Sequence, residues 1–417
     1  MVVKRELSFV EVAVLEESQL TESESRLRKL GIFSSVSIRL TEDDSKPGYK
    51  NIRIGLQEGT PGIIAGGVGY RNDLGIRVFG QSAYTNLWRR NHTLSFNVNV
   101  NRRFDHEFCR NTDNFGVAHG GDCYTEYHAE LGYYWPWFVL GETIFRPKFF
   151  VENTQFLGFD AVTKSLSLGL ERKLLKSINL VGGLSYSLEE TEQENAQASI
   201  DNQKLLIGSI TPTLRLDLRD NSLAPTSGLF SSASFDYASP SLLSQGDPFP
   251  IAFTRFQWRT DRYISFGKNI VFYLSFRTGF EKNLVQTPPE ISQADELARR
   301  YAIPLSKQFA LGGAGSLRGF GEQKLNHHDL AIRGTLSYVN YRTQLDFPFA
   351  GSLKFGPFLD AANLLIDKFS FGILRYGAGV GFHYLSPVGP INFDWGFNLF
   401  PQSGEDPFRF HFSIGVI

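Results

Sequence analysis

The sequence has little cysteine, no excess of one charge and no long hydrophobic run. It holds 2 Cys, and 42 Lys and Arg stand against 43 Asp and Glu in 417 residues, a net charge of −1. So few cysteines exclude a disulfide-rich scaffold, and the balanced charge gives no electrostatic attraction for nucleic acid. No stretch approaches the roughly 18 uninterrupted apolar residues of a transmembrane helix. Disorder is excluded as well, because 14% of the residues are aromatic.

Glycine and phenylalanine are abundant instead, with 40 Gly and 37 Phe. This composition favours many short strands joined by tight turns. The mean hydropathy of −0.18 is ordinary for a water-soluble protein. A membrane β-barrel has the same average, because its strands alternate between apolar residues facing lipid and polar residues facing the lumen. The period of the pattern, and not the average, separates the two classes.

The period is two along most of the chain. In 391–399, Phe393, Trp395 and Phe397 alternate with Asn392 and Asp394. The same alternation runs through residues 94–101, 270–277, 374–384 and 408–416. From residue 63 onward we place about 16 such strands, an even number typical of outer-membrane barrels. The sequence therefore predicts an all-β fold, a 16-stranded antiparallel transmembrane β-barrel over residues 61–417.

The connections between these strands differ in length in a regular way. The long ones are expected at 104–124, 189–202, 239–251 and 282–331, and short ones at 266–269 and 386–390. A membrane barrel has long connections outside the cell and short turns on the periplasmic side. A soluble all-β protein is the alternative for the alternation alone, but it has no reason to sort its connections in this way.

The first 60 residues differ from the rest. A charged helix is expected at 21–30, ended by Gly31, and two strands follow at 34–40 and 51–57. This pattern predicts a small α+β module in the periplasm. No secretory signal opens the chain, so we expect the natural N-terminus to lie upstream.

Several segments resemble one protein family. RLRKLGIFSSVSIRL at 26–40 resembles the last helix and strand of a POTRA domain. ALGGAGSLRGFGEQ at 310–323 resembles the loop motif of the BamA and TamA superfamily of outer-membrane assembly factors and related secretion transporters. GPFLDAANLL at 356–365 resembles a strand motif of the same family, and 216–228 and 377–397 match in order and spacing. The resemblance covers essentially the whole chain, and BamA is the most similar type.

The resemblance implies POTRA domains before the barrel, with residues 1–60 as the C-terminal part of one of them. It also implies that the connection at about 282–331 folds back into the lumen and is fixed there by its motif. The residues involved would be Leu317, Arg318, Gly319, Phe320 and, on the wall, Asp360. The family usually ends with an aromatic residue, so we also expect residues beyond Ile417.

Elementary chemistry supports this attachment of the loop to the barrel wall. A guanidinium can bind a carboxylate with two parallel hydrogen bonds, which would fix a loop in a confined lumen. Gly319 permits an unusual turn, and Phe320 can fill an apolar seat. Asp360 must face the lumen because a carboxylate in lipid is costly, and Phe358 then faces the lumen too. The alternative is that Arg318 is a solvated loop residue.

The first and last strands would meet at a lateral seam, 63–71 against 408–417. Glycine weakens strand interiors, so an opening there would expose unpaired backbone groups to an incoming strand. The residues expected at the seam are Gly66, Gly67, Gly69, Phe410, Phe412 and Ile414. Alternatively, the glycines serve only to fit a narrow lumen under the inserted loop.

Cys109 and Cys123 lie in one long exterior connection and are expected to form a disulfide. A metal site with His106, His119 or His128 is the alternative, without zinc-type spacing to support it.

A hydrolase is a further alternative, because His327 and His328 adjoin Asp329. No Gly-x-Ser-x-Gly motif accompanies them, and solvated loop residues are the expected reading. We therefore expect no enzyme, no cofactor and no metal.

The leading hypothesis is an assembly factor that inserts and folds β-barrel proteins in the outer membrane of a Gram-negative bacterium, an organellar membrane being less favoured. Its partners would be unfolded barrel clients, membrane lipids and accessory periplasmic or lipoprotein subunits, without nucleic acid. A two-partner secretion pore for polypeptides is the alternative, and a passive porin is a third. The upstream sequence and single-channel conductance would discriminate between them.

Overall fold

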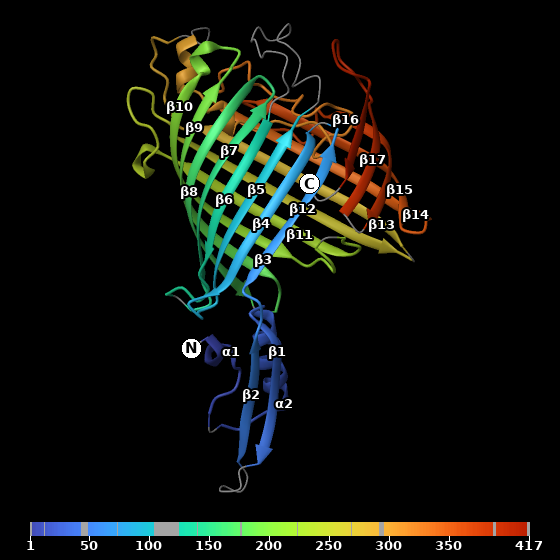
Figure 1. Ribbon diagram of the computed structural model, residues 1–417. Coiled ribbons are helices and arrows are strands. Elements are labelled where there is room, and N and C mark those ends of the chain that lie inside the picture. Colours follow the sequence, from blue (N-terminus) through green and yellow to red (C-terminus); the bar gives the residue numbers. More distant parts are fainter. Residues whose placement is uncertain are drawn as a thin grey trace.

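The computed structural model describes residues 2–11, 13–42, 49–72, 74–103, 125–139, 141–175, 177–222, 224–267, 269–291, 296–386 and 389–414. Figure 1 shows a small N-terminal module beneath a tilted barrel. We call the end of the barrel beside this module the module end and the opposite end the far end. Among the described residues, no helix is long and apolar enough to cross a membrane.

The N-terminal module contains α1 (Val2–Glu6), α2 (Glu17–Lys29) and the antiparallel strands β1 (Phe33–Glu42) and β2 (Lys50–Glu58). Leu27 of α2 and Val36 of β1 are 0% and 2% exposed and form its small core. The helix begins four residues before the predicted start, because Glu16 and Gln19 form a reciprocal capping box. It ends at Lys29, and Gly31 two residues later has a φ of +70°, the left-handed conformation that stops a helix.

Sixteen antiparallel strands, β3 to β18, close into one barrel, which confirms the predicted fold class. Their bounds are β3 (Gly62–Arg71), β4 (Gly75–Leu87), β5 (His92–Arg102), β6 (Thr125–Tyr134), β7 (Ile144–Phe156), β8 (Phe159–Leu175), β9 (Leu180–Glu194), β10 (Gln203–Asp217), β11 (Gly228–Ala238), β12 (Phe253–Phe266), β13 (Ile270–Asn283), β14 (Thr335–Ala350), β15 (Leu353–Ile366), β16 (Arg375–Ser386), β17 (Gly389–Asn398) and β18 (Phe408–Ile414). Each strand pairs with the next along the chain, and β18 returns to β3.

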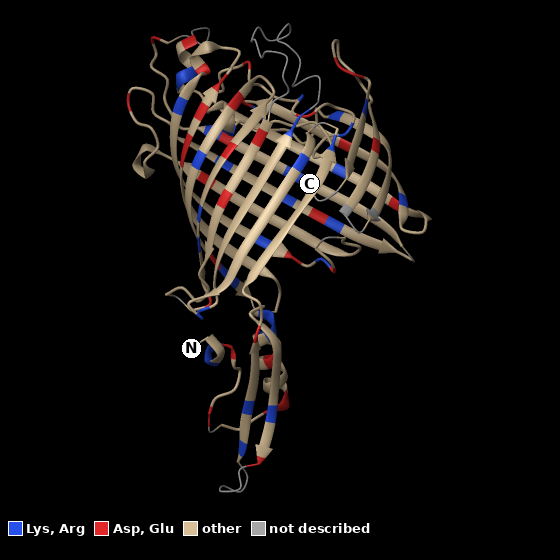
Figure 2. Cartoon of the chain, in the orientation of Figure 1, with Lys and Arg blue, Asp and Glu red and all other residues tan. Residues whose placement is uncertain are grey.

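The wall is apolar outside and polar inside. On β17, Asp394 and Asn398 are 8% and 5% exposed, whereas Phe397 between them is 49% exposed. On β15, Asp360 is fully buried and its neighbour Leu359 is 44% exposed. Figure 2 shows that β3, β4 and β5 carry few charged residues along most of their length, whereas charges gather at the far end and on the module. This distribution suits a lipid-facing belt.

The longest connection described, 284–334, joins β13 to β14 and contains the short 3₁₀ helices η3 (Glu296–Tyr301) and η4 (Leu305–Lys307). The predicted connection at 239–251 is present as 239–252, with η2 (Pro240–Leu242). The prediction of a long connection at 189–202 was wrong, since β9 and β10 extend to leave 195–202, which holds η1 (Ser199–Asp201). The strands extend because their inner faces contact the inserted loop, for example Gln193 at Ser306. The predicted connection 104–124 lies outside the described residues.

At the module end the connections differ in length: 267–269 and 351–352 are short, whereas 135–143 and 218–227 are longer. In the turn between β10 and β11, Asp220 accepts hydrogen bonds from the Thr226 hydroxyl and from the backbone N–H groups of Thr226, Ser227 and Asn221. The hydrogen bond from Thr226, with those backbone bonds, holds the pKa of Asp220 well below its usual range. This carboxylate supplies hydrogen-bond partners for backbone groups of the turn that have no ladder partner.

Candidate functional site

The inserted loop enters the lumen, and its tip is tied to the wall by Arg318. The Arg318 guanidinium donates from Nε to Asp360 Oδ2 at 2.8 Å and from Nη2 to Asp360 Oδ1 at 2.9 Å. The backbone N–H of Arg318 donates to Asp360 Oδ2 at 3.1 Å. Arg318 is 2% exposed and Asp360 is fully buried. The carboxylate therefore binds both the side chain and the backbone of one loop residue, the bidentate geometry that gives such pairs their strength.

Three other wall residues surround the guanidinium. Nη1 donates to Gln344 Oε1 at 2.6 Å and lies 3.5 Å from Asp394 Oδ1. The Phe358 ring stacks beneath it, with the guanidinium carbon 3.5 Å from the ring centroid. A cation over an aromatic face in a desolvated site adds further attraction. Arg318 is thus enclosed by β14, β15 and β17, and the inward orientation of Phe358 is the one that the strand parity predicted.

Polar side chains of the wall also satisfy the backbone of the loop tip. Arg342 donates to the carbonyls of Gly315 and Ala314 at 3.0 and 3.1 Å. Arg277 donates to the same Gly315 carbonyl at 2.9 Å. An irregular backbone in a lumen has no strand partner, so these donors replace the missing ladder.

The tip lies directly on glycines of β16 and β17. A Cβ at Gly377 would stand 1.9 Å from the Arg318 carbonyl oxygen, and one at Gly396 would stand 2.4 Å from the Gly319 nitrogen. Gly319 itself has a φ of +98°. The two wall glycines therefore form a shallow seat that admits the backbone of the loop, and Gly319 makes the turn that fits it.

Leu317 and Phe320 anchor the tip through an apolar cluster, where they are 0% and 4% exposed. The cluster combines loop and wall residues: Ile303, Phe309, Leu311, Leu317, Phe320, Ile332, Leu336, Tyr338, Ala362 and Leu364. We use the word lock for Arg318, Gly319 and their contacts with Asp360, Gln344, Phe358, Asp394, Gly377 and Gly396. The apolar cluster supports the lock from the far end of the barrel.

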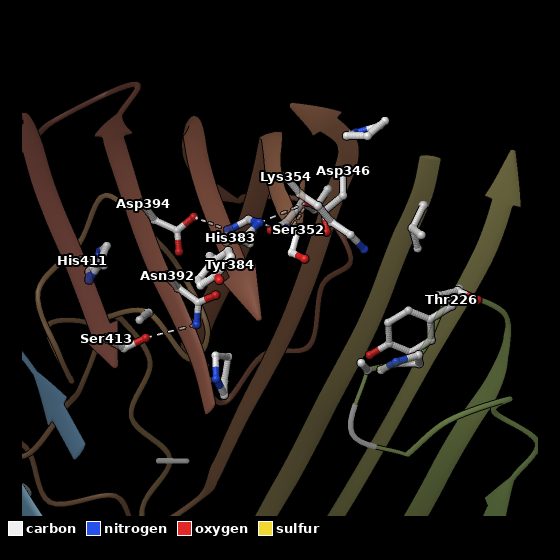
Figure 3. A pocket seen from close by; sticks show the side chains of 18 of the residues that line it. Thr226, Asp346, Ser352, Lys354, His383, Tyr384, Asn392, Asp394, His411 and Ser413 are labelled. Atoms are coloured by element: carbon white, nitrogen blue, oxygen red, sulfur yellow. Dashed lines mark hydrogen bonds and ion pairs between the residues drawn. The ribbon is translucent and has the colours of Figure 1, made fainter. Parts of the chain in front are cut away.

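A cavity of about 840 Å³ lies beneath the lock and reaches the turns at the module end through Thr226 and Ser352. Figure 3 shows His383 on its wall between Asp346 and Asp394. The imidazole contacts their Oδ1 atoms at 3.2 and 3.1 Å. The same cavity borders Asn72 and Ser413, so it extends from the lock to the strands that close the barrel.

The closure between β18 and β3 is short. Among the described residues it consists of two register pairs, Ser413 with Arg71 and Ile414 with Tyr70, whereas β3 pairs with β4 through ten. Asn72 extends the closure with its side chain. It donates from Nδ2 to the Phe410 carbonyl at 2.6 Å and accepts at Oδ1 from the Phe412 N–H at 3.0 Å. The backbone N–H of Asn72 also donates to the Phe412 carbonyl, at 3.0 Å. Asn72 therefore extends the closure with both its backbone and its side chain.

The predicted seam residues occupy this closure and the wall around it. Phe412 stacks on Phe393 and packs near Tyr70, with centroid distances of 4.7 and 5.7 Å, and Phe410 packs near Trp395 at 5.2 Å. Ile414 forms a register pair, and Gly69 is buried on β3.

The glycines of β3 have neighbours other than the inserted loop. A Cβ at Gly67 would stand 2.7 Å from the Phe79 ring, and one at Gly66 would stand 3.2 Å from the Phe79 carbonyl oxygen. These positions therefore make room for β4. The close approach to the inserted loop is made at Gly377 and Gly396, and the alternative that the β3 glycines fit a narrow lumen stays a prediction.

The loop also contacts both strands of the seam. Glu322 Oε2 lies 3.4 Å from Arg71 Nη2 on β3. The Gly319 N–H points at His411 Nε2 on β18, 3.5 Å away. One connection therefore touches the two sides of the closure from within.

Other candidate residues do not assemble a reactive group. His327 Nε2 and His328 Nδ1 lie 3.2 and 3.0 Å from the backbone carbonyls of Leu364 and Leu157. The expectation of solvated loop residues is wrong for His328, which is 6% exposed because it packs against Phe159. Within the described part of the chain, no group of three or more His, Cys, Asp or Glu is placed to hold a metal.

The proposed disulfide and metal residues are only partly described. Cys109, Cys123, His106 and His119 lie outside the described residues, so the disulfide stays a prediction. His128 is on the lumenal face of β6, where its Nδ1 is 3.1 Å from Glu152 Oε2.

Sequence reasoning missed Gln344, Asp394, Arg342 and Asn72. For Arg342, Gln344 and Asp394 a signal existed, because strand parity places each on the inner face of its strand. Their convergence on Arg318 depends on register between β14, β15 and β17, which one sequence does not contain. Asn72 gave no signal, since its role depends on where β18 ends its pairing.

The comparisons with known proteins agree with this architecture. The sequence matches the Omp85 superfamily domain over residues 86–416. The fold is similar to the crystal structure of BamA from Haemophilus ducreyi lacking POTRA domains 1-3, with a TM-score of 0.74 at 16% identity, covering 99% of this chain and 80% of that one.

Two further structures are similar over 99% of this chain. CdiB from Acinetobacter baumannii has a TM-score of 0.56 at 15% identity, with 70% of its own chain covered. CdiB from Escherichia coli has a TM-score of 0.58 at 14% identity, with 73% covered. No curated protein sequence matches. Because the superfamily domain spans most of the sequence and includes the lock, the chain belongs to the Omp85 superfamily.

Proposed function

We propose that this chain is an outer-membrane assembly factor that inserts β-barrel proteins by pairing a client strand with the edge of β3. The observation that carries the proposal is the weak closure. Residues Gly62–Gly69 of β3 have no partner on the β18 side among the described residues. An edge strand presents a row of N–H and C=O groups, which is the template used in β-augmentation.

Energetics favour an opening at this place. Among the described residues, the seam depends on two register pairs and on the backbone and side-chain hydrogen bonds of Asn72, whereas β8 and β9 pair through fifteen residues. Each net hydrogen bond contributes about 0.5–1.5 kcal/mol. Opening the seam therefore costs far less than opening any other described strand pair, and an incoming strand would restore the lost bonds. No catalytic group is needed, so we propose a non-enzymatic function without a cofactor.

The proposal includes location and partners. An apolar outer wall over a polar lumen suits the outer membrane of a Gram-negative bacterium. We propose that residues 1–60 are the C-terminal part of a POTRA domain, through which periplasmic or lipoprotein subunits bind. The clients would be unfolded β-barrel proteins.

A crosslink across the seam tests the function. In a Cys109→Ser/Cys123→Ser background, Tyr70→Cys and Ile414→Cys would face each other on paired strands. Oxidation should abolish insertion of a barrel client into lipid vesicles, and reduction should restore it. The matched control is Phe149→Cys with Leu166→Cys, an outward-facing pair on β7 and β8. Full insertion by the oxidised seam variant would reject templating.

Polypeptide passage through the lumen is a second candidate, favoured by the cavity under the lock. Passage requires the loop tip to leave the lumen, whereas templating at the outer edge does not. Ser316→Cys and Asn340→Cys, whose parent residues are linked by a hydrogen bond of 2.8 Å, would tie the tip to the wall. If this crosslink blocks export of a polypeptide and leaves barrel insertion unchanged, the chain is a pore.

A further inference from the structure

Part of the outer wall is covered by the chain itself. At the far end of β14 and β15, Ser337, Val339 and Asn363 point outward, since the alternate residues face the lumenal cluster. They are nevertheless only 1%, 0% and 3% exposed. The covering segment is the connection between β15 and β16, residues 367–374, which we call the flap.

Hydrogen bonds fix the flap against this wall. The Ser337 hydroxyl donates to the Lys368 carbonyl at 2.5 Å. The Asn363 amide donates to the carbonyls of Ser370 and Gly372 at 2.8 and 2.9 Å. The connection therefore folds down along the outer face and does not rise away from the barrel. Two outward polar side chains and three flap carbonyls satisfy one another, which removes polar groups that would be costly in lipid.

The other side of the flap is apolar. Phe369, Phe371 and Ile373 are 45%, 60% and 64% exposed. The two aromatic rings pack edge to face, 5.0 Å apart. The segment therefore has a period of two, with small Ser370 and Gly372 beside the wall and large apolar side chains away from it.

We propose that the flap is a membrane-contacting element, seated at the boundary between acyl chains and headgroups of the outer leaflet. It continues the lipid-facing surface of the strands below, where Leu359 of β15 is 44% exposed. A girdle of aromatic residues at each interface is a property of such barrels. Here part of the girdle is supplied by a folded-back connection, and exposed Lys368 at its start suits the lipid phosphates.

The distribution of polar groups favours lipid over a protein partner. A docking surface for protein normally mixes apolar anchors with polar groups that remain available for the partner. In the flap, the carbonyls of Lys368, Ser370 and Gly372 are turned toward the barrel and bonded there. Beyond Asp367 and Lys368 at its start, the side chains that the flap exposes are the three apolar ones, as in a segment adapted to an environment without hydrogen-bond partners.

A nitroxide at residue 371 tests this. The Phe371→Cys variant, in the Cys109→Ser/Cys123→Ser background, is labelled and reconstituted in vesicles of phosphatidylethanolamine and phosphatidylglycerol. We expect collisions with oxygen to exceed those with a water-soluble nickel chelate several-fold, as at a Leu359→Cys reference on the wall. A Val14→Cys label on the N-terminal module, at a residue 90% exposed, should show the opposite ratio.

A second experiment releases the flap from the barrel wall. Adding Asn363→Ala should shift the label at 371 toward the nickel chelate, because two of the bonds that hold the flap are lost. The matched control is Thr343→Ala, another outward polar residue on β14, whose hydroxyl bonds the Leu359 carbonyl away from the flap. A ratio at 371 equal to that at 14 would overturn the proposal. So would a label shielded from both reagents, which would indicate a protein partner; Ile373→Cys repeats the test if Phe371→Cys does not fold.

Discussion

The lock and the seam are neighbours in one wall, yet their stability differs greatly. At the lock, one residue of the loop is almost fully buried and is held by Asp360, Gln344 and a stacked ring. At the seam, as far as it is described, two register pairs and the hydrogen bonds of Asn72 close the barrel. Strong contacts are therefore concentrated where the inserted loop is attached, and few contacts join β3 to β18. This difference is what a barrel requires if it opens at one place only.

Glycine has a different role in the two regions. At the lock, Gly377 and Gly396 let a backbone approach within a distance that no Cβ would allow. On β3, Gly62 has no atom within 4 Å of its potential Cβ. The first use is steric, whereas Gly62 only removes side-chain packing at the start of its strand. Substitutions can separate these roles.

Removing the lock should have the largest effect. Arg318→Ala leaves the Asp360 carboxylate buried without its main cation, a loss that typically costs about 3–5 kcal/mol. We expect the inserted loop to become sensitive to protease and the folded form to convert at a lower temperature in heat-modifiability gels, while strand content by circular dichroism is retained. Arg318→Lys should convert at a temperature between those of the parent and of Arg318→Ala, because lysine keeps the charge but cannot form two parallel hydrogen bonds with the carboxylate.

Arg146 provides the matched control for this experiment. It forms an ion pair with Glu171 at 3.2 Å on the barrel wall, but the side chain is 40% exposed. Exposed pairs contribute about 0–1 kcal/mol, so Arg146→Ala should leave the gel transition nearly unchanged. If Arg318→Ala behaved like Arg146→Ala, the lock would not fix the loop.

The glycine seat is the next test. Gly396→Ala places a methyl group against the Gly319 nitrogen, and overpacking of this kind costs about 1–3 kcal/mol. We expect a lower conversion temperature and faster proteolysis in the loop. Gly62→Ala is the control, since its methyl group would enter open space. Equal effects of both substitutions would show that the seat is not a steric requirement.

Much of this architecture could be predicted from one sequence, and the reason is physical. Alternation along a strand is a local property, so Asp394 and Asp360 could be placed on the inner face before any coordinates. Arg318 was found through its motif. Gln344 and Asp394 reach Arg318 only through the register between neighbouring strands, and Asn72 bridges the seam only because of where β18 pairs. Neither can be read from one sequence. The position of the flap could not be predicted either. Asn363 is a polar residue on the outer, apolar face of its strand, and this makes sense only once the segment that covers it is known.

Asn72→Ala should weaken the seam, with a smaller effect than the substitutions at the lock. It removes two side-chain hydrogen bonds to the backbone of Phe410 and Phe412, worth roughly 1–3 kcal/mol together. Amide hydrogen exchange in peptides from β3 and β18 should accelerate, while exchange in β8 and β9 should not change. Asn101→Ala is a matched control, because that amide bonds a lumenal carboxylate at 3.3 Å on β6 instead. Unchanged exchange at the seam in Asn72→Ala would exclude a clasp at this position.

The smallest effect concerns the link between the two regions. Glu322→Gln removes the ion pair with Arg71. The two side chains are 22% and 20% exposed, so the pair contributes about 0–1 kcal/mol to stability. We expect a modest rise in exchange at the end of β3, because one of the contacts between the loop and this strand would be lost. Lys307→Gln breaks another ion pair of the same loop, with Glu189 on β9, and should leave the seam unchanged. If Glu322→Gln raises exchange and Lys307→Gln does not, a seated loop favours a closed seam, and opening of one must weaken the other.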